Sequence, residues 1–192
     1  MKIGFAGFQR TGKTTAAHRL VSEIKLSTRT CNLVSGAARS SRRLLLRDLG
    51  LDTHLEIIGT QIAMEAQAGQ FSDFVVCDRT VLDYVAYGRC RGLHIGPTGV
   101  IFRSISDFCQ SYAQTYDVIF IVKGTLSNRD GDQSRKVEDV GEGCFDREIA
   151  CLTEPLGPRV KLVATSSDEL LDTALDWLHR EGNSHGPKDN AS

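Results

Sequence analysis

The sequence predicts an α/β fold in which a parallel sheet has helices on both faces. Five short apolar runs alternate with stretches whose apolar residues recur at helical spacing. This alternation is typical of parallel sheets, because a helix must carry the chain back between parallel strands. A glycine-rich loop also joins the first apolar run to the first helical stretch. A chain of 192 residues can bury a core of its own, so we expect a single domain over residues 1–180.

The predicted elements follow one another in a regular order. We expect strands at 2–8, 30–34, 74–78, 117–122 and 160–164. We expect helices at 13–25, 37–49, 55–68, 81–91, 100–115, 144–152 and 167–179, with a break at Gly50 between the second and the third. Residues 92–99 form a predicted loop. Residues 181–192 contain little that could be buried, so they form a predicted disordered tail.

Composition argues against a nucleic-acid or membrane partner. Hydrophobic residues make up 41% of the chain and the formal net charge is −1, so no overall basic field attracts polyanions or anionic lipid. No apolar run approaches the roughly 18 residues that a membrane span needs. The first strand begins at once, which leaves no room for a signal peptide and predicts a cytoplasmic protein. Because the six cysteines form no C-x-x-C pair, we expect reduced thiols, several of them in the core.

The strongest motif lies between the first strand and the first helix. Residues 7–14, Gly-Phe-Gln-Arg-Thr-Gly-Lys-Thr, match the P-loop pattern G-x-x-x-x-G-K-[ST]. Its glycines let backbone N–H groups face a phosphate at the positive end of a helix, Lys13 supplies a charge, and Thr14 supplies a hydroxyl for Mg²⁺. The alternative is a chance glycine turn, which the strand and helix on either side disfavour. The candidate nucleotide-binding residues are Gly7, Gln9, Arg10, Thr11, Gly12, Lys13, Thr14 and Thr15.

A second candidate site follows the third strand. Asp78 and Arg79 end that strand, and ligands of open parallel sheets bind beyond the carboxyl ends of the strands. Asp78 is a candidate Mg²⁺ ligand or base, and Arg79 a candidate phosphate ligand; the alternative is a pair that caps the next helix. Arg79 occupies the place where an ATPase usually carries a water-activating Glu, and no N-K-x-D or D-x-x-G motif of a GTPase is present. These features favour phosphoryl transfer to a bound acceptor.

Residues 75–87 resemble the D-R-x-x-x-D-x-x-A-Y segment of the P-loop nucleotide and nucleoside kinases. That group includes the nicotinamide-riboside kinases and, more distantly, thymidylate kinase, and the resemblance spans the chain to about residue 179. It implies a sheet order of 2-3-1-4-5, ATP and Mg²⁺ as co-substrates, and a small nucleotide-like acceptor. The predicted catalytic residues are Lys13, Asp78, Arg79 and Arg135.

The acceptor is the least determined part of the prediction. Group members often carry Glu-Ala-Ala-Arg after the second strand, whereas this chain has Gly36-Ala37-Ala38-Arg39. Losing that acid removes a base for a hydroxyl acceptor and favours a nucleoside monophosphate, although Asp78 could still act as base. The candidate acceptor-binding residues are Arg39, Arg43, Gln61, Glu65, Arg79 and Tyr84. For Gln61 and Glu65, an ordinary surface pair is the alternative.

Residues 123–140 have the position and the polar, glycine-rich composition of a kinase lid. Closing over ATP would bring Arg129 to the nucleotide and Arg135 to the transferring phosphate; a plain surface loop is the alternative. Two other functions remain open. One is a nucleoside or nicotinamide-riboside-type kinase, and the other is a nucleotide-dependent switch. A homodimer is compatible with the sequence.

Overall fold

A single five-stranded parallel sheet organises the computed structural model, which describes residues 1–123, 140–164 and 167–181. The strands are β1 (Lys2–Gly7), β2 (Cys31–Val34), β3 (Phe74–Asp78), β4 (Val118–Lys123) and β5 (Val160–Ala164), in the order β2-β3-β1-β4-β5. Every neighbouring pair is parallel. The fold class and the implied strand order are therefore confirmed.

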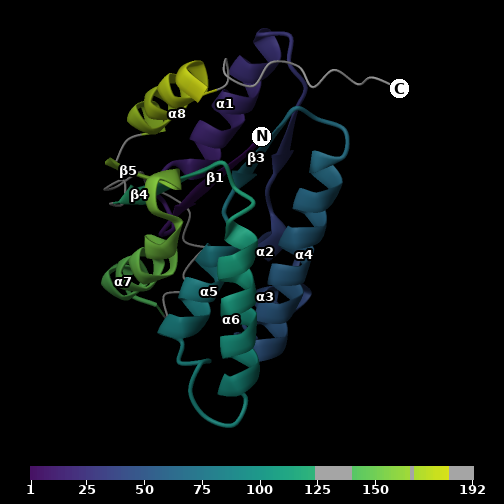
Figure 1. Cartoon of the computed structure of the whole chain (residues 1–192). Coiled ribbons are helices and arrows are strands. Elements are labelled where there is room, and N and C mark those ends of the chain that lie inside the picture. Colours follow the sequence, from purple (N-terminus) through teal and green to yellow (C-terminus); the bar gives the residue numbers. More distant parts are fainter. Residues whose placement is uncertain (124–139, 165–166, 182–192) are drawn as a thin grey trace.

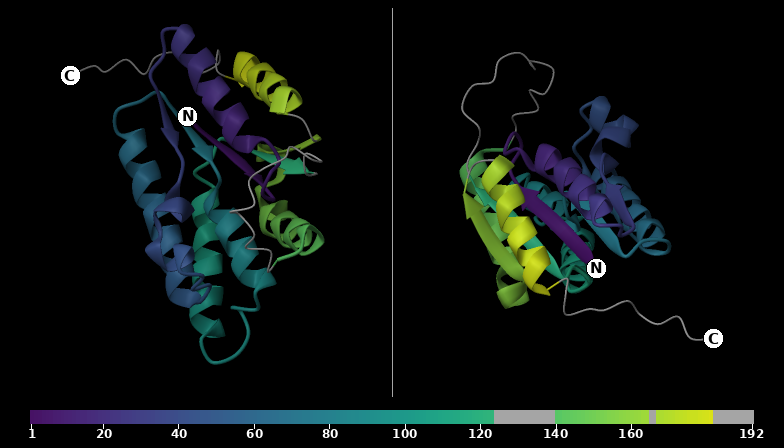
Figure 2. Two further views of the ribbon diagram at one scale, coloured as in Figure 1. Left: turned by 180° about the vertical axis from the view of Figure 1, so that it is seen from behind. Right: turned by 90° about the horizontal axis from the view of Figure 1, so that it is seen from above.

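Helices cover both faces of this sheet (Figure 1). On one face lie α1 (Lys13–Leu26) and α8 (Ser167–Glu181), which run side by side in Figure 2. On the other face lie α4 (Leu51–Gly69), α5 (Val81–Cys90), α6 (Gly99–Ala113) and α7 (Glu142–Thr153). A 3-10 helix, η2 (Glu154–Arg159), leads into β5 and was not predicted. No helix in the described ranges is long and apolar enough to cross a membrane.

Each face has its own core. Ile3, Phe5 and Phe120 point toward α1 and α8, where Leu20 and Leu170 meet them. Ile119, Ile121 and Cys77 point to the other face, among residues of α4 to α7. Because the inner strands are buried on both sides, they appear in the sequence as continuous apolar runs, which made them easy to predict.

The predicted helix at 37–49 is wrong. The chain forms two short helices there, α2 (Ala37–Ser40) and α3 (Arg42–Leu45), separated by Ser41 in an extended conformation. The Ser41 hydroxyl is buried, accepts a hydrogen bond from the Leu44 N–H, and donates to Glu56 at 3.1 Å. A serine that caps a new helix turns the chain, which hydrophobic spacing alone does not reveal.

The expectation that all cysteines are reduced is also wrong. Cys90, the last residue of α5, forms a disulfide with Cys144 in the first turn of α7. The other four are free: Cys31, Cys77 and Cys109 are buried, and Cys151 is exposed. Burial raises the pKa of the Cys31 thiol to about 11, so this thiol stays protonated near neutral pH. Spacing could not reveal the bridge, because its two halves are 54 residues apart.

Two predicted segments lie outside the described residues. They are the lid, apart from its end residues Lys123 and Val140, and the tail from residue 182 onward. The lid arginines Arg129 and Arg135 belong to the first of these segments, so their predicted roles are untested.

Candidate active site

Strands β1 and β3 bring the two sequence motifs to one edge of the sheet. The strands are parallel neighbours, and Phe5 pairs with Asp78, so their carboxyl ends lie together. The Thr14 hydroxyl, in the first turn of α1, donates a hydrogen bond of 2.7 Å to Oδ2 of Asp78. The predicted meeting of the P-loop with Asp78 is therefore found in the structure.

The loop between β1 and α1 has the backbone of a phosphate cradle. Gly7, Arg10 and Gly12 have φ values of 145°, 62° and 83°. A Cβ at Gly7 would lie 2.5 Å from the carbonyl oxygen of Val122, so only glycine fits there. Of the other loop candidates, Gln9 is partly buried, Thr11 is buried, and Thr15 is exposed.

The start of α1 lacks a side-chain cap. Gly12 is the N-cap residue and provides no side-chain hydrogen bond, and the first turn contains no acidic residue. The first N–H groups of a helix have no intrahelical partner and carry partial positive charge. A 14-residue helix that begins in this way, behind a loop of left-handed residues, suits an anion such as a phosphate.

Lys13 lies buried against its own loop. Its ammonium group donates to the carbonyl oxygen of Phe8 and to the Thr11 hydroxyl at 2.6 Å. Burial, helped by the nearby Arg79, lowers the pKa of Lys13 to about 7, although Asp83 and Asp78 raise it. A lysine with this pKa is sensitive to any added negative charge, because a bound phosphate would favour its protonated form.

Thr14 and Asp78 fit a magnesium site. Both offer oxygen atoms, which are the ligands that Mg²⁺ prefers, and Asp78 is only 5% exposed. No group of three or more His, Cys, Asp or Glu side chains that could hold a metal is found among the residues described. If Mg²⁺ binds, the pair would share the ion with substrate phosphates and water, as is usual for magnesium in phosphoryl-transfer sites.

Arg79 is folded inward beneath the P-loop. Its φ is 111°, which is unusual for a residue other than glycine. Its guanidinium lies 3.5 Å from the Gly7 carbonyl oxygen and 3.3 Å from Oδ1 of Asp83, and 5.6 Å from the centre of the Tyr87 ring. Burial alone would lower the pKa of Arg79, but Tyr87, Asp83 and other neighbours raise it above its usual range, so Arg79 stays charged.

No role was predicted for Asp83 or Tyr87 from the sequence. The Asp83 carboxylate is fully buried and accepts a hydrogen bond from the Gly7 N–H at 3.0 Å. The Tyr87 ring stacks on Phe8 and lies 4.8 Å from Phe145 of α7. Both belong to the D-R-x-x-x-D-x-x-A-Y segment, and the Thr80-x-x-Asp83 spacing of a capping box could have drawn attention to Asp83.

Arg39 lies at the mouth of the site, whereas Arg43 does not. Nη2 of Arg39 is 4.0 Å from Oδ2 of Asp78, and its side chain is 61% exposed. Arg43 instead pairs with three carboxylates, Asp48 at 3.1 Å, Asp52 at 3.8 Å and Glu56 at 3.9 Å. The break at Ser41 separates the two arginines, so they do not form the row that one continuous helix would have made.

Gly36, which stands where the kinase group often has an acid, has φ 89°. A Cβ there would meet nothing within 4 Å, so space is available. The left-handed backbone is what disfavours another residue at this position.

Gln61, Glu65 and Tyr84 form a buried polar chain, so the surface-pair alternative is wrong. The side-chain amide nitrogen of Gln61 donates to Oε1 of Glu65 at 2.8 Å and to the Arg79 carbonyl oxygen at 3.1 Å. The side-chain oxygen of Gln61 accepts a hydrogen bond from the Tyr84 hydroxyl at 3.4 Å. Glu65 also forms an ion pair of 3.0 Å with Lys2, the first residue of β1. Gln61 therefore lies near Arg79, but Glu65 faces the opposite, amino-terminal edge of the sheet.

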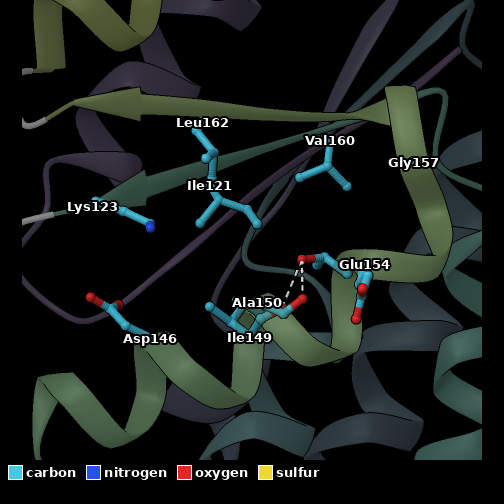
Figure 3. A pocket seen from close by; sticks show the side chains of 10 residues that line it. Ile121, Lys123, Asp146, Ile149, Ala150, Glu154, Gly157, Val160 and Leu162 are labelled. Atoms are coloured by element: carbon cyan, nitrogen blue, oxygen red, sulfur yellow. Dashed lines mark hydrogen bonds between the residues drawn. The ribbon is translucent and has the colours of Figure 1, made fainter.

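A separate pocket of about 280 Å³ lies between β4, β5 and α7 (Figure 3). Its walls are mostly apolar, including Ile121 and Leu162, with Lys123 and Asp146 at one end. None of the described candidates for nucleotide or acceptor binding lines it.

Comparison with known proteins gives the fold. No protein-family model and no curated protein matches the sequence. Among solved structures, NadR protein in complex with NR matches all of this chain with a TM-score of 0.70 at 17% identity. NadR protein in complex with NAD and AMP-PNP matches with a TM-score of 0.68 at 16% identity.

The chain spans 54% of the NadR chain in complex with NR and 51% of the NadR chain in complex with NAD and AMP-PNP. Deoxyadenosine kinase from M. mycoides with bound dATP matches 93% of this chain and 100% of its own, with a TM-score of 0.60 at 13% identity. At identities this low, structural similarity establishes the fold but not the substrate. The chain therefore has a P-loop kinase-like fold.

Proposed function

We propose that the protein transfers the γ-phosphoryl group of ATP to a small nucleotide-like acceptor, and that this acceptor is a nucleoside monophosphate. The observation that carries the proposal is the contact between Thr14 and Asp78, which joins the P-loop to the carboxylate of β3 at one edge of the sheet. The uncapped start of α1 supplies N–H groups for phosphate oxygens at the same place. The likeness to NadR protein and to deoxyadenosine kinase supports a kinase.

Each residue has a distinct part in this reaction. The loop N–H groups and Lys13 hold the β- and γ-phosphates, and Thr14 and Asp78 would hold Mg²⁺, which supplies charge neutralisation across the transferring phosphates. Arg79 is charged, and it replaces the Glu that would activate water, which favours transfer over hydrolysis. Catalysis then depends on positioning and on charge stabilisation.

Arg39 is our candidate for the acceptor phosphate. It is exposed at the mouth of the site, close to Asp78, and its guanidinium can form a forked contact with a phosphate. A phosphate acceptor is already ionised and needs no strong base, in agreement with Gly36 in place of an acid. Arg43 is the weaker candidate, because carboxylates already surround its guanidinium.

A free nucleoside is the second candidate acceptor. The buried Asp78 carboxylate could accept a proton from a hydroxyl group, and deoxyadenosine kinase is among the similar structures. In that case Arg39 would have little to bind. A cytoplasmic location and a homodimer stay predictions from the sequence.

Replacing Arg39 with Ala separates the two acceptors. A charge-assisted contact contributes about 1.5–3 kcal/mol, so Arg39→Ala should lower kcat/KM for a monophosphate roughly tenfold to a hundredfold, with the KM for ATP nearly unchanged. Steady-state kinetics with both substrates varied measure this. Arg19→Ala is the matched control, because Arg19 pairs with Asp168 between α1 and α8, away from the site. Loss of ATP affinity, or preference for a nucleoside over every monophosphate, would contradict the assignment.

A further inference from the structure

The buried carboxylate of Asp83 accepts hydrogen bonds from two segments of the chain, the P-loop and the residues that lead from β3 into α5. It is 0% exposed and accepts hydrogen bonds from the Gly7 N–H of the P-loop, from the backbone N–H and hydroxyl of Thr80, and from the Arg79 guanidinium. A buried charge needs such compensation, because each unsatisfied oxygen would be costly. The four contacts hold the Asp83 carboxylate in one position.

The two oxygens of Asp83 have different partners. Oδ2 accepts from the Thr80 N–H at 2.9 Å and from the Thr80 hydroxyl at 2.8 Å, which completes the capping box of α5. Oδ1 accepts from the Gly7 N–H at 3.0 Å and lies 3.3 Å from Nη1 of Arg79. Capping requires only Oδ2, so the contacts of Oδ1 need another explanation.

Both backbone polar groups of Gly7, the N–H and the carbonyl oxygen, have side-chain partners. Its N–H bonds to Asp83, its carbonyl oxygen lies 3.5 Å from the Arg79 guanidinium, and the absence of a side chain lets it approach Val122 of β4 closely. As the first residue of the P-loop, Gly7 sets the direction in which the loop leaves the sheet. Arg79, with its left-handed backbone, lies in the same contact group.

We propose that Asp83 is a positioning residue that fixes the P-loop and Arg79 relative to each other through Oδ1. This inference rests on the proposed function, in which the loop holds the phosphates of ATP and the charged Arg79 takes the place of a water-activating Glu. Asp83 itself lies behind Gly7 and is 0% exposed, so it would act through its neighbours and not by contact with a substrate. Small displacements of groups that contact phosphates can cost about a hundredfold in rate, so a fixed spacing between them matters.

Asp83→Asn tests the inference, with Thr80→Val as its matched control. The amide keeps the size of the carboxylate but places an NH₂ group against donors and removes the charge opposite Arg79. Thr80→Val keeps the shape of the threonine and removes its hydroxyl, which donates to Oδ2 and belongs to the capping box of α5, while the contacts of Oδ1 stay in place. Binding of ADP and ATP with Mg²⁺ is measured by calorimetry on folded proteins, together with thermal unfolding and with kcat and KM for ATP and for the acceptor.

We expect Asp83→Asn to lower nucleotide affinity and kcat/KM for ATP about tenfold to a hundredfold, while KM for the acceptor stays within about threefold. Thr80→Val should lower the unfolding temperature and leave nucleotide binding within about threefold of wild type. If the two variants lose stability and nucleotide affinity in parallel, or if Asp83→Asn binds nucleotide normally, Asp83 is only a helix cap and the inference is overturned.

A second measurement covers the case in which Asp83→Asn does not fold. Hydrogen exchange of the wild-type Gly7 amide should be slow without nucleotide and remain slow in Thr80→Val; fast exchange would overturn the inference. Nucleotide binding that depends on Asp83, without phosphorylation of any acceptor, would overturn the proposed function and leave the positioning role standing. A wild-type protein that binds no nucleotide would overturn both.

Discussion

The buried environment of Lys13 changes the pKa of its ammonium group. Its ammonium group bonds to Phe8 and Thr11 within its own loop, and its pKa is about 7, mainly because it is buried. The protonated form is the one that neutralises phosphates. A triphosphate bound beside Lys13 would raise its pKa again, so binding above pH 7 should take up a proton.

The affinity for nucleotide should therefore fall as pH rises from about 7 to 9. The affinity should fall by about tenfold per pH unit over the range in which Lys13 is neutral in the free protein and charged in the nucleotide complex. Titration calorimetry of ADP without Mg²⁺, in buffers of different ionisation enthalpy, measures both the affinity and the proton uptake. Lys13→Ala should abolish the proton uptake. An affinity that does not change with pH in the wild type would contradict the assigned pKa.

Individual site residues were predictable where a motif fixes the backbone. Thr14 and Asp78 lie together as expected, because the glycine loop and a strand end determine their places, while the roles of Lys13, Thr14 and Asp78 stay predictions. Glu65 could not be placed from the sequence, since its direction depends on its ion pair with Lys2, 63 residues away. Asp83 was overlooked because its role involves the Gly7 backbone, and sequence patterns do not display backbone contacts.

Among the secondary-structure elements, α5 and α7 form the pair that supports the P-loop from one side. Phe145 of α7 lies 5.7 Å from Phe8 and 4.8 Å from Tyr87 of α5. Two further links join these helices, the Cys90–Cys144 disulfide and an ion pair of 3.6 Å between Arg89 and Glu148. The disulfide lies one residue before Phe145, so it constrains the end of α7 nearest the loop.

Removing the disulfide should reduce stability and leave the fold intact. A bridge across 54 residues contributes on the order of 2–4 kcal/mol, chiefly by restricting the unfolded chain. We expect Cys144→Ser, or reduction of the wild type, to lower the free energy of unfolding by about that amount. Denaturant titration measures it. Cys151→Ser, which changes an exposed free thiol, is the control and should have little effect.

If the wild-type protein unfolds at the same denaturant concentration whether its disulfide is intact or reduced, the bridge does not have this role. Mass spectrometry of the alkylated protein establishes which thiols are free in each sample.

Strands were easier to predict than helices, for a physical reason. The predicted third and fifth strands have the observed bounds, because β3 is a continuous buried run and β5 begins directly after turn residues. The predicted helix at 37–49 failed because the bond between the Ser41 hydroxyl and the Leu44 N–H starts a new helix at a point where apolar spacing continues.

At the scale of the whole molecule, the sheet separates two polar regions. Thr14, Lys13 and Asp78 lie at the carboxyl edge, while the partly exposed Lys2 and the buried Glu65 and Tyr116 form a network toward the amino edge. The alternating element order predicted a parallel sheet, and the resemblance to nucleotide and nucleoside kinases implied the strand order that is observed. The buried polar residues of α4 face one edge of the sheet or the other, and packing between distant segments decides which. Sequence patterns do not show such packing.

Transfer of label from γ-labelled ATP shows directly whether the protein is a nucleotide kinase. The purified protein is incubated with Mg²⁺ and labelled ATP against a panel of nucleosides and nucleoside monophosphates, and the products are separated by chromatography. We expect label to appear in a nucleoside diphosphate, with free phosphate a minor product, and we expect Lys13→Ala to lose this transfer by about a hundredfold or more while remaining folded. Labelled free phosphate as the sole product with every acceptor, or undiminished transfer by folded Lys13→Ala, would contradict it.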